Sequence, residues 1–321
     1  MALGEFDLIR RYFSRATPSA LLGIGDDAAL VAPTPGQALV VAADTLVEGH
    51  HFFAGTAPEA LGWKALAVNL SDMAAMGATP RWFTLCLTLP AAEPDWLAGF
   101  AAGLYALAER HQVELIGGDT TGGPLAFSVQ ILGEVAPGQA LRRAGARIGD
   151  DVWLSGPTGA AALAVEARYG RLTLAPDDLA YCANRLDRPE PRVELGLALA
   201  GLAHAAIDIS DGLLADAGHL AACSGVAVHL HTDLLPSLPL PPALANSAAA
   251  WRAALGGGDD YELCFTAAPQ QRATIERIGE KLGLPLTRIG QIEAGQGVRL
   301  LDDAGRPQQV ERLGFDHFAG K

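Results

Sequence analysis

The stretch Gly23-Ile24-Gly25-Asp26-Asp27-Ala28-Ala29 places two adjacent carboxylates between a glycine-broken turn and an apolar run. A single Asp-Asp pair is common in solvated loops, but acidic residues stand beside glycine or end an apolar run at several further places. These residues are Asp44, Asp119, Asp208, Asp211, Asp259 and Asp260. Carboxylates that converge repel one another unless cations lie between them, and Mg²⁺ prefers such oxygen ligands. The sequence therefore predicts a magnesium site built from scattered aspartates.

One more carboxylate lies in an unusual place. A helix is predicted over Pro58–Met76, because apolar residues such as Leu66 and Leu70 recur at helical spacing. Asp72 lies inside this helix among apolar neighbours, where a carboxylate is costly unless it is paired or bound to a metal. Its interior position excludes a helix-capping role, so Asp72 joins the candidate ligands.

Length and charge limit the possible partners. With 321 residues, the chain exceeds one typical core, and two domains are expected. The formal net charge of -13 argues against a basic face for nucleic acid and against attraction to an anionic membrane. We therefore expect neither partner. Phosphates would have to be bound through metal ions, backbone N–H groups and a few arginines.

The cysteines and the first residues indicate a compartment. Cys86, Cys182, Cys223 and Cys264 form no Cys-x-x-Cys pair, so we interpret them as small, reduced hydrophobic residues. The stretch Met1–Asp7 carries acids where a signal peptide needs bases, and no apolar run is long enough to cross a bilayer. The sequence predicts a cytoplasmic protein.

Strand-like and helix-like segments alternate in the first half, which favours an α/β (α+β) fold. The run Leu39–Ala43 is continuously apolar, so we expect a strand that is buried on both faces and ends at Asp44. A short strand, Val113–Ile116, is expected to run into a glycine-rich loop that carries Asp119. Such a loop is either an ordinary turn or a place where backbone N–H groups approach a phosphate.

The composition changes near Pro137-Gly138-Gln139, and we place a domain boundary there, between domains 1–138 and 139–321. A basic cluster then follows: Arg142, Arg143 and Arg147. This cluster is either a solvated loop or a group that neutralises a phosphate.

Several runs, taken together, resemble the thiamine-monophosphate kinases. They follow one another in the family's order along nearly the whole chain. The matching runs are Gly4–Phe6, Gly23–Asp27, Asp44–Gly49 with His51-Phe52, Lys64–Gly77, Gly117–Thr121, Asp208–Gly212, Asp260–Leu263 and Gly314–Phe318.

The resemblance implies the two-domain fold shared with aminoimidazole-ribotide synthetase and selenophosphate synthetase. In that fold, the N-terminal mixed sheet with its helices pairs with a second subunit into a barrel, and the C-terminal domain is an α/β layer structure. The N-terminal domain would bind metal and ATP and dimerise, and the C-terminal domain would complete the active site. The implied reaction transfers the γ-phosphoryl group of ATP to thiamine monophosphate and gives thiamine diphosphate and ADP.

The resemblance also implies roles for single residues. Those implied as Mg²⁺ ligands are Asp27, Asp44, Asp72, Asp119, Asp208 and Asp211. Those implied as ATP contacts are Gly118, Asp119, Arg143 and Ser210. Those implied as substrate contacts are His51, Asp259 and Phe315. No residue is expected to act as an acid, a base or a nucleophile, since an array of several Mg²⁺ ions would carry the chemistry.

The chain departs from the family pattern at two positions. Ala42 and Ala43 precede Asp44, where the family usually has a hydroxyl residue, so a metal contact there would need a backbone carbonyl or water. Asp259 stands where related sequences often carry Glu, and its shorter side chain would reach the thiamine moiety directly or through water.

Other functions remain open at this point. The nearest is another ATP-dependent enzyme of the same superfamily, of the purine cyclo-ligase type. Selenophosphate synthetase is less favoured, because no reactive cysteine occupies the N-terminal region. Two further classes are a non-catalytic nucleotide- or metal-binding module and a metal-dependent phosphohydrolase that releases phosphate without an acceptor.

Overall fold

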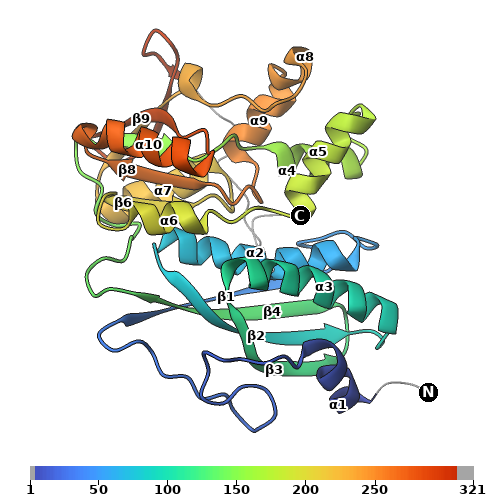
Figure 1. The fold of residues 1–321 in the computed structure, drawn as a ribbon. Coiled ribbons are helices and arrows are strands. Elements are labelled where there is room, and N and C mark those ends of the chain that lie inside the picture. Colours follow the sequence, from blue (N-terminus) through green and yellow to red (C-terminus); the bar gives the residue numbers. More distant parts are fainter. Residues whose placement is uncertain (1–3, 309–321) are drawn as a thin grey trace. The chain divides into compact units, whose positions relative to one another are not determined.

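The computed structural model describes residues 4–308, and in it the chain divides into two units, each with its own sheet (Figure 1). The first unit consists of Met1–Met73 and Ala78–Gly138, and the second consists of Ala74–Gly77 and Gln139–Lys321. Both units combine a sheet with helices, so the expected α/β (α+β) class is confirmed.

A four-stranded sheet forms the centre of the first unit, in the order β1-β4-β2-β3. The elements are α1 (Glu5–Leu8), the π-helix η1 (Ile9–Phe13), β1 (Ala38–Val47), α2 (Pro58–Ala75), β2 (Thr79–Leu89), α3 (Pro94–His111), β3 (Glu114–Gly122) and β4 (Ala126–Val135). Strand β4 runs antiparallel to β1 and β2, whereas β2 and β3 are parallel.

Helices α2 and α3 lie together over one face of this sheet (Figure 1). Glycine lets their backbones approach closely. A Cβ atom at Gly62 would lie 1.9 Å from the Phe100 carbonyl oxygen, and one at Gly103 would lie 1.8 Å from the Glu59 carbonyl oxygen. Neither contact can accommodate a side chain, so the two glycines fix the spacing of the helix pair.

Strand β1 differs from its sequence-based prediction. It continues through Asp44 to Val47, and it is not buried on both faces: Leu39 is 42% exposed and Val41 is 55% exposed, whereas Val40 is buried. The physical reason is its position. Strand β1 lies at the edge of the sheet, and in the described part of this single chain the helices cover one face only.

Strand β3 is also longer than predicted, because Asp119 lies within it rather than in a loop. The glycines that suggested a loop allow close pairing instead. A Cβ atom at Gly118 would lie 1.8 Å from the Leu85 carbonyl oxygen, and Gly118 has a φ of +147°. The close approach to β2 therefore requires glycine here, whether or not a phosphate binds.

The sheet face away from the two helices carries a transverse row of polar side chains. Thr45 pairs with Ser128, Ser128 with Cys86, and Cys86 with Asp119. The Thr45 and Ser128 hydroxyl oxygens are 2.7 Å apart. In the described chain, Cys86 and Asp119 of this row are exposed.

A seven-stranded mixed sheet forms the second unit, in the order β11-β10-β7-β9-β5-β8-β6. Its strands are β5 (Asp151–Leu154), β6 (Ala205–Asp208), β7 (Ala227–His231), β8 (Leu263–Ala267), β9 (Thr287–Glu293), β10 (Gly297–Leu301) and β11 (Pro307–Gln308). Its helices are α4 (Ala160–Arg168), α5 (Pro176–Asp187), α6 (Val193–Leu199), α7 (Leu213–Ser224), α8 (Pro242–Ala245), α9 (Ala248–Gly256) and α10 (Arg272–Leu282), with short 3₁₀ turns at Thr232–Leu234 and Pro269–Gln271.

The core of this unit lies between α7 and the sheet. Leu213, Ala217 and Leu220 of α7 pack in one cluster with strand residues such as Ile207 and Leu230, all of them buried. Because α7 begins directly after β6, this packing fixes the short turn that joins the two.

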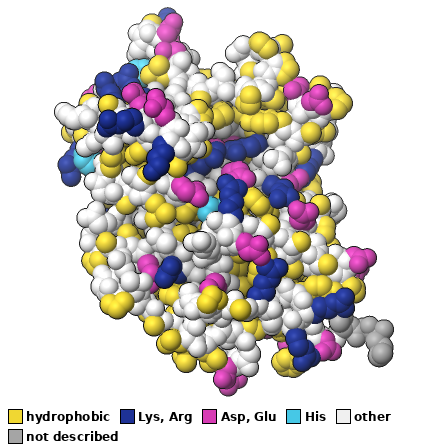
Figure 2. Space-filling view, viewed as in Figure 1, with side chains coloured by type: hydrophobic (Ala, Val, Ile, Leu, Met, Phe, Trp, Pro, Cys, Tyr) yellow, Lys and Arg dark blue, Asp and Glu magenta, His cyan; other side chains and the backbone are white. Residues whose placement is uncertain are grey.

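Acidic side chains lie among basic ones on the face drawn in Figure 2. Among the described residues, none of the helices combines the length and the apolar character that a membrane span requires.

Three of the four thiols, those of Cys182, Cys223 and Cys264, should differ sharply in reactivity. Cys182 and Cys264 are buried, and burial raises the pKa of their thiols to about 11 and about 12, respectively. Cys223 is exposed. At neutral pH, we expect Ellman's reagent to modify Cys223 rapidly and the two buried thiols only after unfolding in denaturant. A Cys223→Ser variant shows which part of the fast phase belongs to Cys223, and rapid modification of Cys182 or Cys264 in the folded protein would contradict the described core.

Candidate active site

Three of the predicted site residues lie on the turn between β6 and α7. Asp208 is the last residue of β6 and is buried, and Ser210 and Asp211 follow it half-exposed. Gly212 is the N-terminal cap of α7 and has a φ of +115°, a conformation that favours glycine. The turn thus places two carboxylates and a hydroxyl at the N-terminal end of a helix, where backbone N–H groups attract anions.

A second segment, 256–262, packs directly against this turn. The N–H of Asp259 donates to the Ser210 carbonyl at 2.9 Å, and the N–H of Tyr261 donates to the Ile209 carbonyl at 2.8 Å. In return, the N–H of Ile209 donates to the Glu262 carbonyl at 2.8 Å. These hydrogen bonds bring Asp259 beside the predicted metal- and ATP-binding turn.

Glycine makes this approach possible. A Cβ atom at Gly258 would lie 2.3 Å from the Ser210 carbonyl oxygen, and one at Gly212 would lie 2.8 Å from the Gly256 carbonyl carbon. The packing of the two backbone segments therefore explains Gly258 and Gly212, whereas a Cβ atom at Gly257 would lie 2.4 Å from Ala162 Cβ.

Asp259 is held in a strained conformation. Its φ is +65°, and Tyr261 two residues later has a φ of +53°; both values lie in the left-handed region that L-residues seldom occupy. The Tyr261 hydroxyl donates to Asp259 Oδ1 at 2.9 Å. The segment thus presents the Asp259 carboxylate in a defined orientation.

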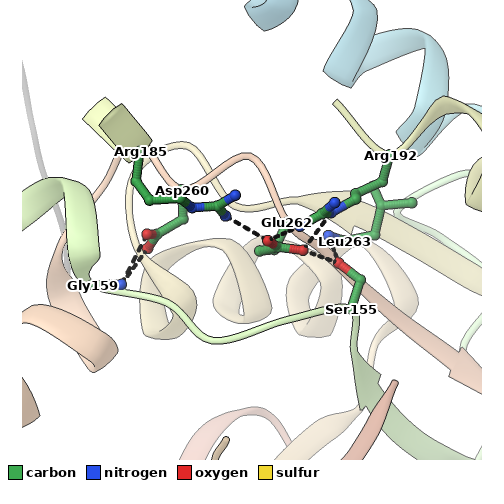
Figure 3. A network of polar contacts seen from close by, with 7 residues as sticks. All are labelled: Ser155, Gly159, Arg185, Arg192, Asp260, Glu262 and Leu263. Atoms are coloured by element: carbon green, nitrogen blue, oxygen red, sulfur yellow. Dashed lines mark hydrogen bonds and ion pairs between the residues drawn. The ribbon is translucent and has the colours of Figure 1, made fainter. Parts of the chain in front are cut away.

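A buried ionic network around Glu262 holds the C-terminal end of the 256–262 segment (Figure 3). Glu262 is fully buried and accepts hydrogen bonds from Arg185 at 2.6 Å, from Arg192 Nε at 2.7 Å and from the Ser155 hydroxyl at 2.5 Å. Although burial opposes ionisation, Arg192 and Arg185 hold the pKa of Glu262 below its usual value. Glu262 is therefore a paired anion that ties α5 and the start of α6 to β8.

Asp260 anchors the same segment to another helix. Both of its carboxylate oxygens accept from the N–H of Gly159, at 2.8 Å each, and Gly159 is the N-terminal cap of α4 (Figure 3). Burial raises the pKa of Asp260 well above its usual value, even though the Gly159 N–H opposes this shift.

Asp216, in the first turn of α7, contacts the backbone N–H groups of the 208–212 turn. Its Oδ2 accepts hydrogen bonds from three successive backbone N–H groups, and burial raises its pKa to about 7, with Asp208 and Asp211 contributing in the same direction. The charges of Asp208 and Asp211 therefore act on a common neighbour. Asp216 is not among the site residues predicted from the sequence, although an acid at the start of a helix is a recognisable signal.

In the first unit, the register separates two of the predicted metal ligands. Asp44 pairs with Val129 in a row of buried side chains, whereas Asp119 pairs with exposed Cys86. Because side chains alternate along a strand, Asp44 lies on the face covered by the helices and Asp119 on the opposite face. Asp72 lies on α2, one of the helices that cover the face of Asp44.

Another buried polar group lies one turn before Asp72. Asn69 is fully buried, and its Nδ2 donates to the Ala65 carbonyl at 3.1 Å. Its Oδ1 is among the buried side-chain oxygens without a hydrogen-bond partner in the described chain. An unsatisfied buried acceptor beside an intrahelical carboxylate is typical of a site completed by a ligand or water.

The remaining predicted residues of the first unit lie in loops or at strand ends. Asp27 is exposed, and its backbone N–H donates to Asp26 Oδ1 at 2.8 Å. His51 is half-buried, and its Nδ1 accepts from the Val47 N–H at 3.0 Å, which assigns the ring proton to Nε2. His50 is exposed.

A pocket of about 370 Å³ lies beside the segment that carries His50 and His51. It is formed at the ends of β1 and β2 and the starts of α2 and α3. Glu48, Phe53 and Trp96 are among its lining residues. His51 and the predicted aspartates do not line it, so the pocket is separate from the predicted site residues of this unit.

The structure does not bring every predicted site residue close to the 208–212 turn. Arg143 is exposed, and its carbonyl accepts from the Ser224 hydroxyl at the last residue of α7, whereas Asp211 precedes the first turn of that helix. A helix of 12 residues spans about 18 Å. Phe315 lies outside the described residues. Within residues 4–308, no group of three or more His, Cys, Asp or Glu side chains is arranged to hold a metal ion by itself.

Comparison with known proteins defines the class and then the family. The model of the AIR synthase related N-terminal domain matches residues 25–135, and that of the C-terminal domain matches residues 147–303. This domain pair is that of the AIR synthase-related proteins. Thiamine-monophosphate kinase of Escherichia coli (strain K12) is 44% identical over 324 residues, which cover 99% of each chain. The chain belongs to the thiamine-monophosphate kinase family.

Solved structures agree with this assignment. The crystal structure of thiamine-monophosphate kinase from Stenotrophomonas maltophilia K279a is 53% identical, covers 94% of this chain and 97% of its own, and has a TM-score of 0.86. AaThiL complexed with AMPPCP and TMP is 33% identical, covers 99% of both chains and has a TM-score of 0.78. The hydrogenase maturation protein HypE, at 19% identity and a TM-score of 0.77 over 99% of both chains, shares the fold.

The network around Glu262 generates a stability prediction. In Glu262→Gln, the two arginines lose their buried counter-charge, so we expect the free energy of unfolding to fall by about 3–5 kcal/mol in urea denaturation. Because the folded pKa of Glu262 is lowered, the wild-type contribution is present above its usual value of 4.5 and is lost as the pH falls through the lowered value.

The variant should therefore lose less stability on acidification than the wild type. Asp7→Asn, which breaks the exposed pair with Arg10, is the matched control and should have a much smaller effect. Equal effects of the two substitutions would show that the buried network does not support the segment.

Proposed function

We propose that the protein transfers the γ-phosphoryl group of ATP to thiamine monophosphate, giving thiamine diphosphate and ADP, with Mg²⁺ as the metal. The observation that carries the proposal is the joining of the 208–212 turn to the 256–262 segment by three backbone hydrogen bonds. This contact sets the proposed metal and ATP ligands Asp208, Ser210 and Asp211 beside the proposed thiamine contact Asp259. Membership of the family supports the choice of both substrates.

The carboxylates fit nucleotide-bound magnesium. Mg²⁺ is usually held by one or two carboxylates together with substrate phosphates and water, rather than by a complete protein cage. The structure offers such sets separately: Asp208 and Asp211 on one turn, Asp44 and Asp72 on one side of the N-terminal sheet, and Asp119 on the other. We propose that these residues and Asp27 hold several Mg²⁺ ions on the phosphates. Asn69 Oδ1 would accept a hydrogen bond from a water bound to Mg²⁺.

The remaining contacts follow the family pattern. We propose that Gly118, Asp119, Arg143 and Ser210 contact ATP, and that His51, Asp259 and Phe315 contact the thiamine substrate. The Nε2–H of His51 would donate to an acceptor on the substrate, since Nδ1 already accepts from the chain. The carboxylate of Asp259, oriented by Tyr261, suits the aminopyrimidine or the positive thiazolium ring.

The proposed transfer needs no general base. The attacking atom is a phosphate oxygen that is anionic at neutral pH, so the obstacle is the repulsion between two anions. Mg²⁺ held by the proposed carboxylates would supply positive charge that lowers the repulsion between the two phosphates. The chain's own residues align the two phosphates, and the Arg143 guanidinium adds charge on the nucleotide. We expect direct in-line transfer without a covalent phospho-enzyme.

One assay separates this proposal from its rivals. Enzyme, ATP, Mg²⁺ and thiamine monophosphate are incubated, and both thiamine diphosphate and free phosphate are measured. The proposal requires thiamine diphosphate equal to the ADP formed. Free phosphate without thiamine diphosphate would indicate a phosphohydrolase. No ATP consumption would favour a binding module or a superfamily enzyme with a different acceptor.

Asp72→Asn keeps the size of the side chain and removes its charge. If Asp72 holds Mg²⁺ on the phosphates, kcat should fall on the order of a hundredfold or more, because charge stabilisation in the transition state is lost. Asp95→Asn, an exposed acid in the first turn of α3, serves as the control and should leave kcat unchanged. Near-normal turnover of Asp72→Asn at saturating Mg²⁺ would remove Asp72 from the site.

We also propose a cytoplasmic homodimer. Support for the dimer comes from the sheet face opposite α2 and α3, which exposes Leu39, Val41 and the small residue Ala43. A second copy that placed the same face against it would bury these apolar groups.

Cys86 on this face provides a local probe of the dimer. Sedimentation should give twice the chain mass of 33.3 kDa, with a Cys86 thiol that reacts slowly. Val41→Lys should dissociate the dimer and expose Cys86 to Ellman's reagent, because a charge would be buried without a partner. Ile148→Lys, at an apolar site of the second unit that is 65% exposed, is the matched control and should leave the protein dimeric. A wild-type monomer would refute the proposal.

A further inference from the structure

The geometry points to Asp216 as a positioning residue, which holds the 208–212 turn in the shape that presents Asp208 and Asp211 to a metal-bound nucleotide. This role rests on the proposed function, because it assumes that the turn binds Mg²⁺ and phosphate. Asp216 is not proposed to touch the metal or either substrate.

The contacts of Asp216 are unusually concentrated. Its Oδ2 accepts from the backbone N–H groups of Ser210, Asp211 and Gly212, each at 3.1 Å. The side chain is 3% exposed. Its own backbone N–H donates to the Gly212 carbonyl at 3.0 Å, so Asp216 belongs to the first turn of α7. One buried oxygen thus binds three consecutive peptide groups.

Three such bonds determine the direction of the turn. When consecutive N–H groups converge on one acceptor, the peptide planes that carry them are fixed relative to one another. The Ser210 and Asp211 side chains extend from these planes, and Asp208 lies two residues before Ser210. The opposite side of the turn is bonded to the 256–262 segment through the Ser210 and Ile209 carbonyls. The turn is therefore held from both sides, and Asp216 supplies all the bonds to the three N–H groups.

The competing explanation is that Asp216 only stabilises the fold. The two roles differ in what they require. Stability alone is disturbed by any loss of a buried hydrogen-bonded group, here or elsewhere in the unit. Positioning requires an acceptor oxygen at this point, whether or not it is charged. Asparagine can place its Oδ1 where Asp216 Oδ2 lies, whereas leucine has a similar size and no acceptor.

The experiment compares Asp216→Asn and Asp216→Leu with the wild type in the full-length protein. Hydrogen exchange of the Ser210–Gly212 amides is measured without any ligand. Calorimetry then measures the affinity for AMPPCP with Mg²⁺. We expect Asp216→Leu to speed amide exchange in the turn and to weaken Mg²⁺–AMPPCP binding by about 10–100-fold, as loss of a supporting group around a metal site does. Asp216→Asn should recover most of both properties.

Asp150→Leu is the matched control. Asp150 is a buried carboxylate of the same unit that accepts from the Arg147 N–H at 2.8 Å and contacts His204 Nδ1 at 2.8 Å, away from the turn. We expect it to lower the melting temperature without changing nucleotide affinity or exchange at Ser210–Gly212. If a folded Asp216→Leu protein keeps wild-type exchange and affinity, Asp216 has no positioning role. The same conclusion follows if Asp216→Asn is as impaired as Asp216→Leu, or if Asp150→Leu weakens binding equally.

The exchange measurement also distinguishes this inference from the proposed function. Faster exchange in Asp216→Leu, recovered in Asp216→Asn, would establish that the turn depends on the acceptor even if the wild type made no thiamine diphosphate. Unchanged exchange in an active enzyme would leave the proposed function intact and overturn the role of Asp216.

Discussion

Two backbone segments of the second unit approach each other so closely that neither can carry a side chain at the point of contact. Gly258 meets the Ser210 carbonyl and Gly212 meets Gly256, and the hydrogen bonds between the segments depend on this spacing. The strained Asp259 and Tyr261, the buried Glu262 network and the anchor from Asp260 to α4 all hold the same segment in register. This close approach explains why so many polar side chains are buried here, since a mobile 256–262 segment would lose its hydrogen bonds to the 208–212 turn.

Much of the fold follows from local sequence patterns. Helix α2 begins at Pro58, as its apolar spacing predicts, and ends within one residue of its prediction. Strands β1 and β3 were predicted less well, because their lengths depend on tertiary pairing. Continuous apolar residues indicate burial, but among the described residues one face of β1 is left uncovered. Glycines in β3 indicate a loop, but close pairing with β2 requires them equally.

The candidate site was also predictable only where local sequence patterns decide the position of a residue. Acids beside glycine mark the positions where short turns leave strands, so Asp208, Asp211 and Asp259 could be selected from the sequence, and the structure brings their segments together. Sequence proximity could not show that Asp44 and Asp119 lie on opposite faces of a sheet, because Asp119 was placed in a loop rather than in a strand. Asp216 and Glu262 were given no role from the sequence because their importance comes from their partners. These partners lie at the turn preceding α7 for Asp216, and on α5 and at the N-terminal cap of α6 for Glu262.

The strand order of the second unit has a consequence for synthesis of the chain on the ribosome. Strand β5 pairs with β8 and β9, which lie more than a hundred residues later, and β6 also pairs with β8. All strands of the first sheet, by contrast, lie between Ala38 and Val135. The N-terminal sheet can therefore form while the rest is still being translated, whereas β5 must wait for β8 and β9. During that delay the edges of β5 and β6 have no partner strand, and their apolar residues stay exposed until β8 and β9 have been made.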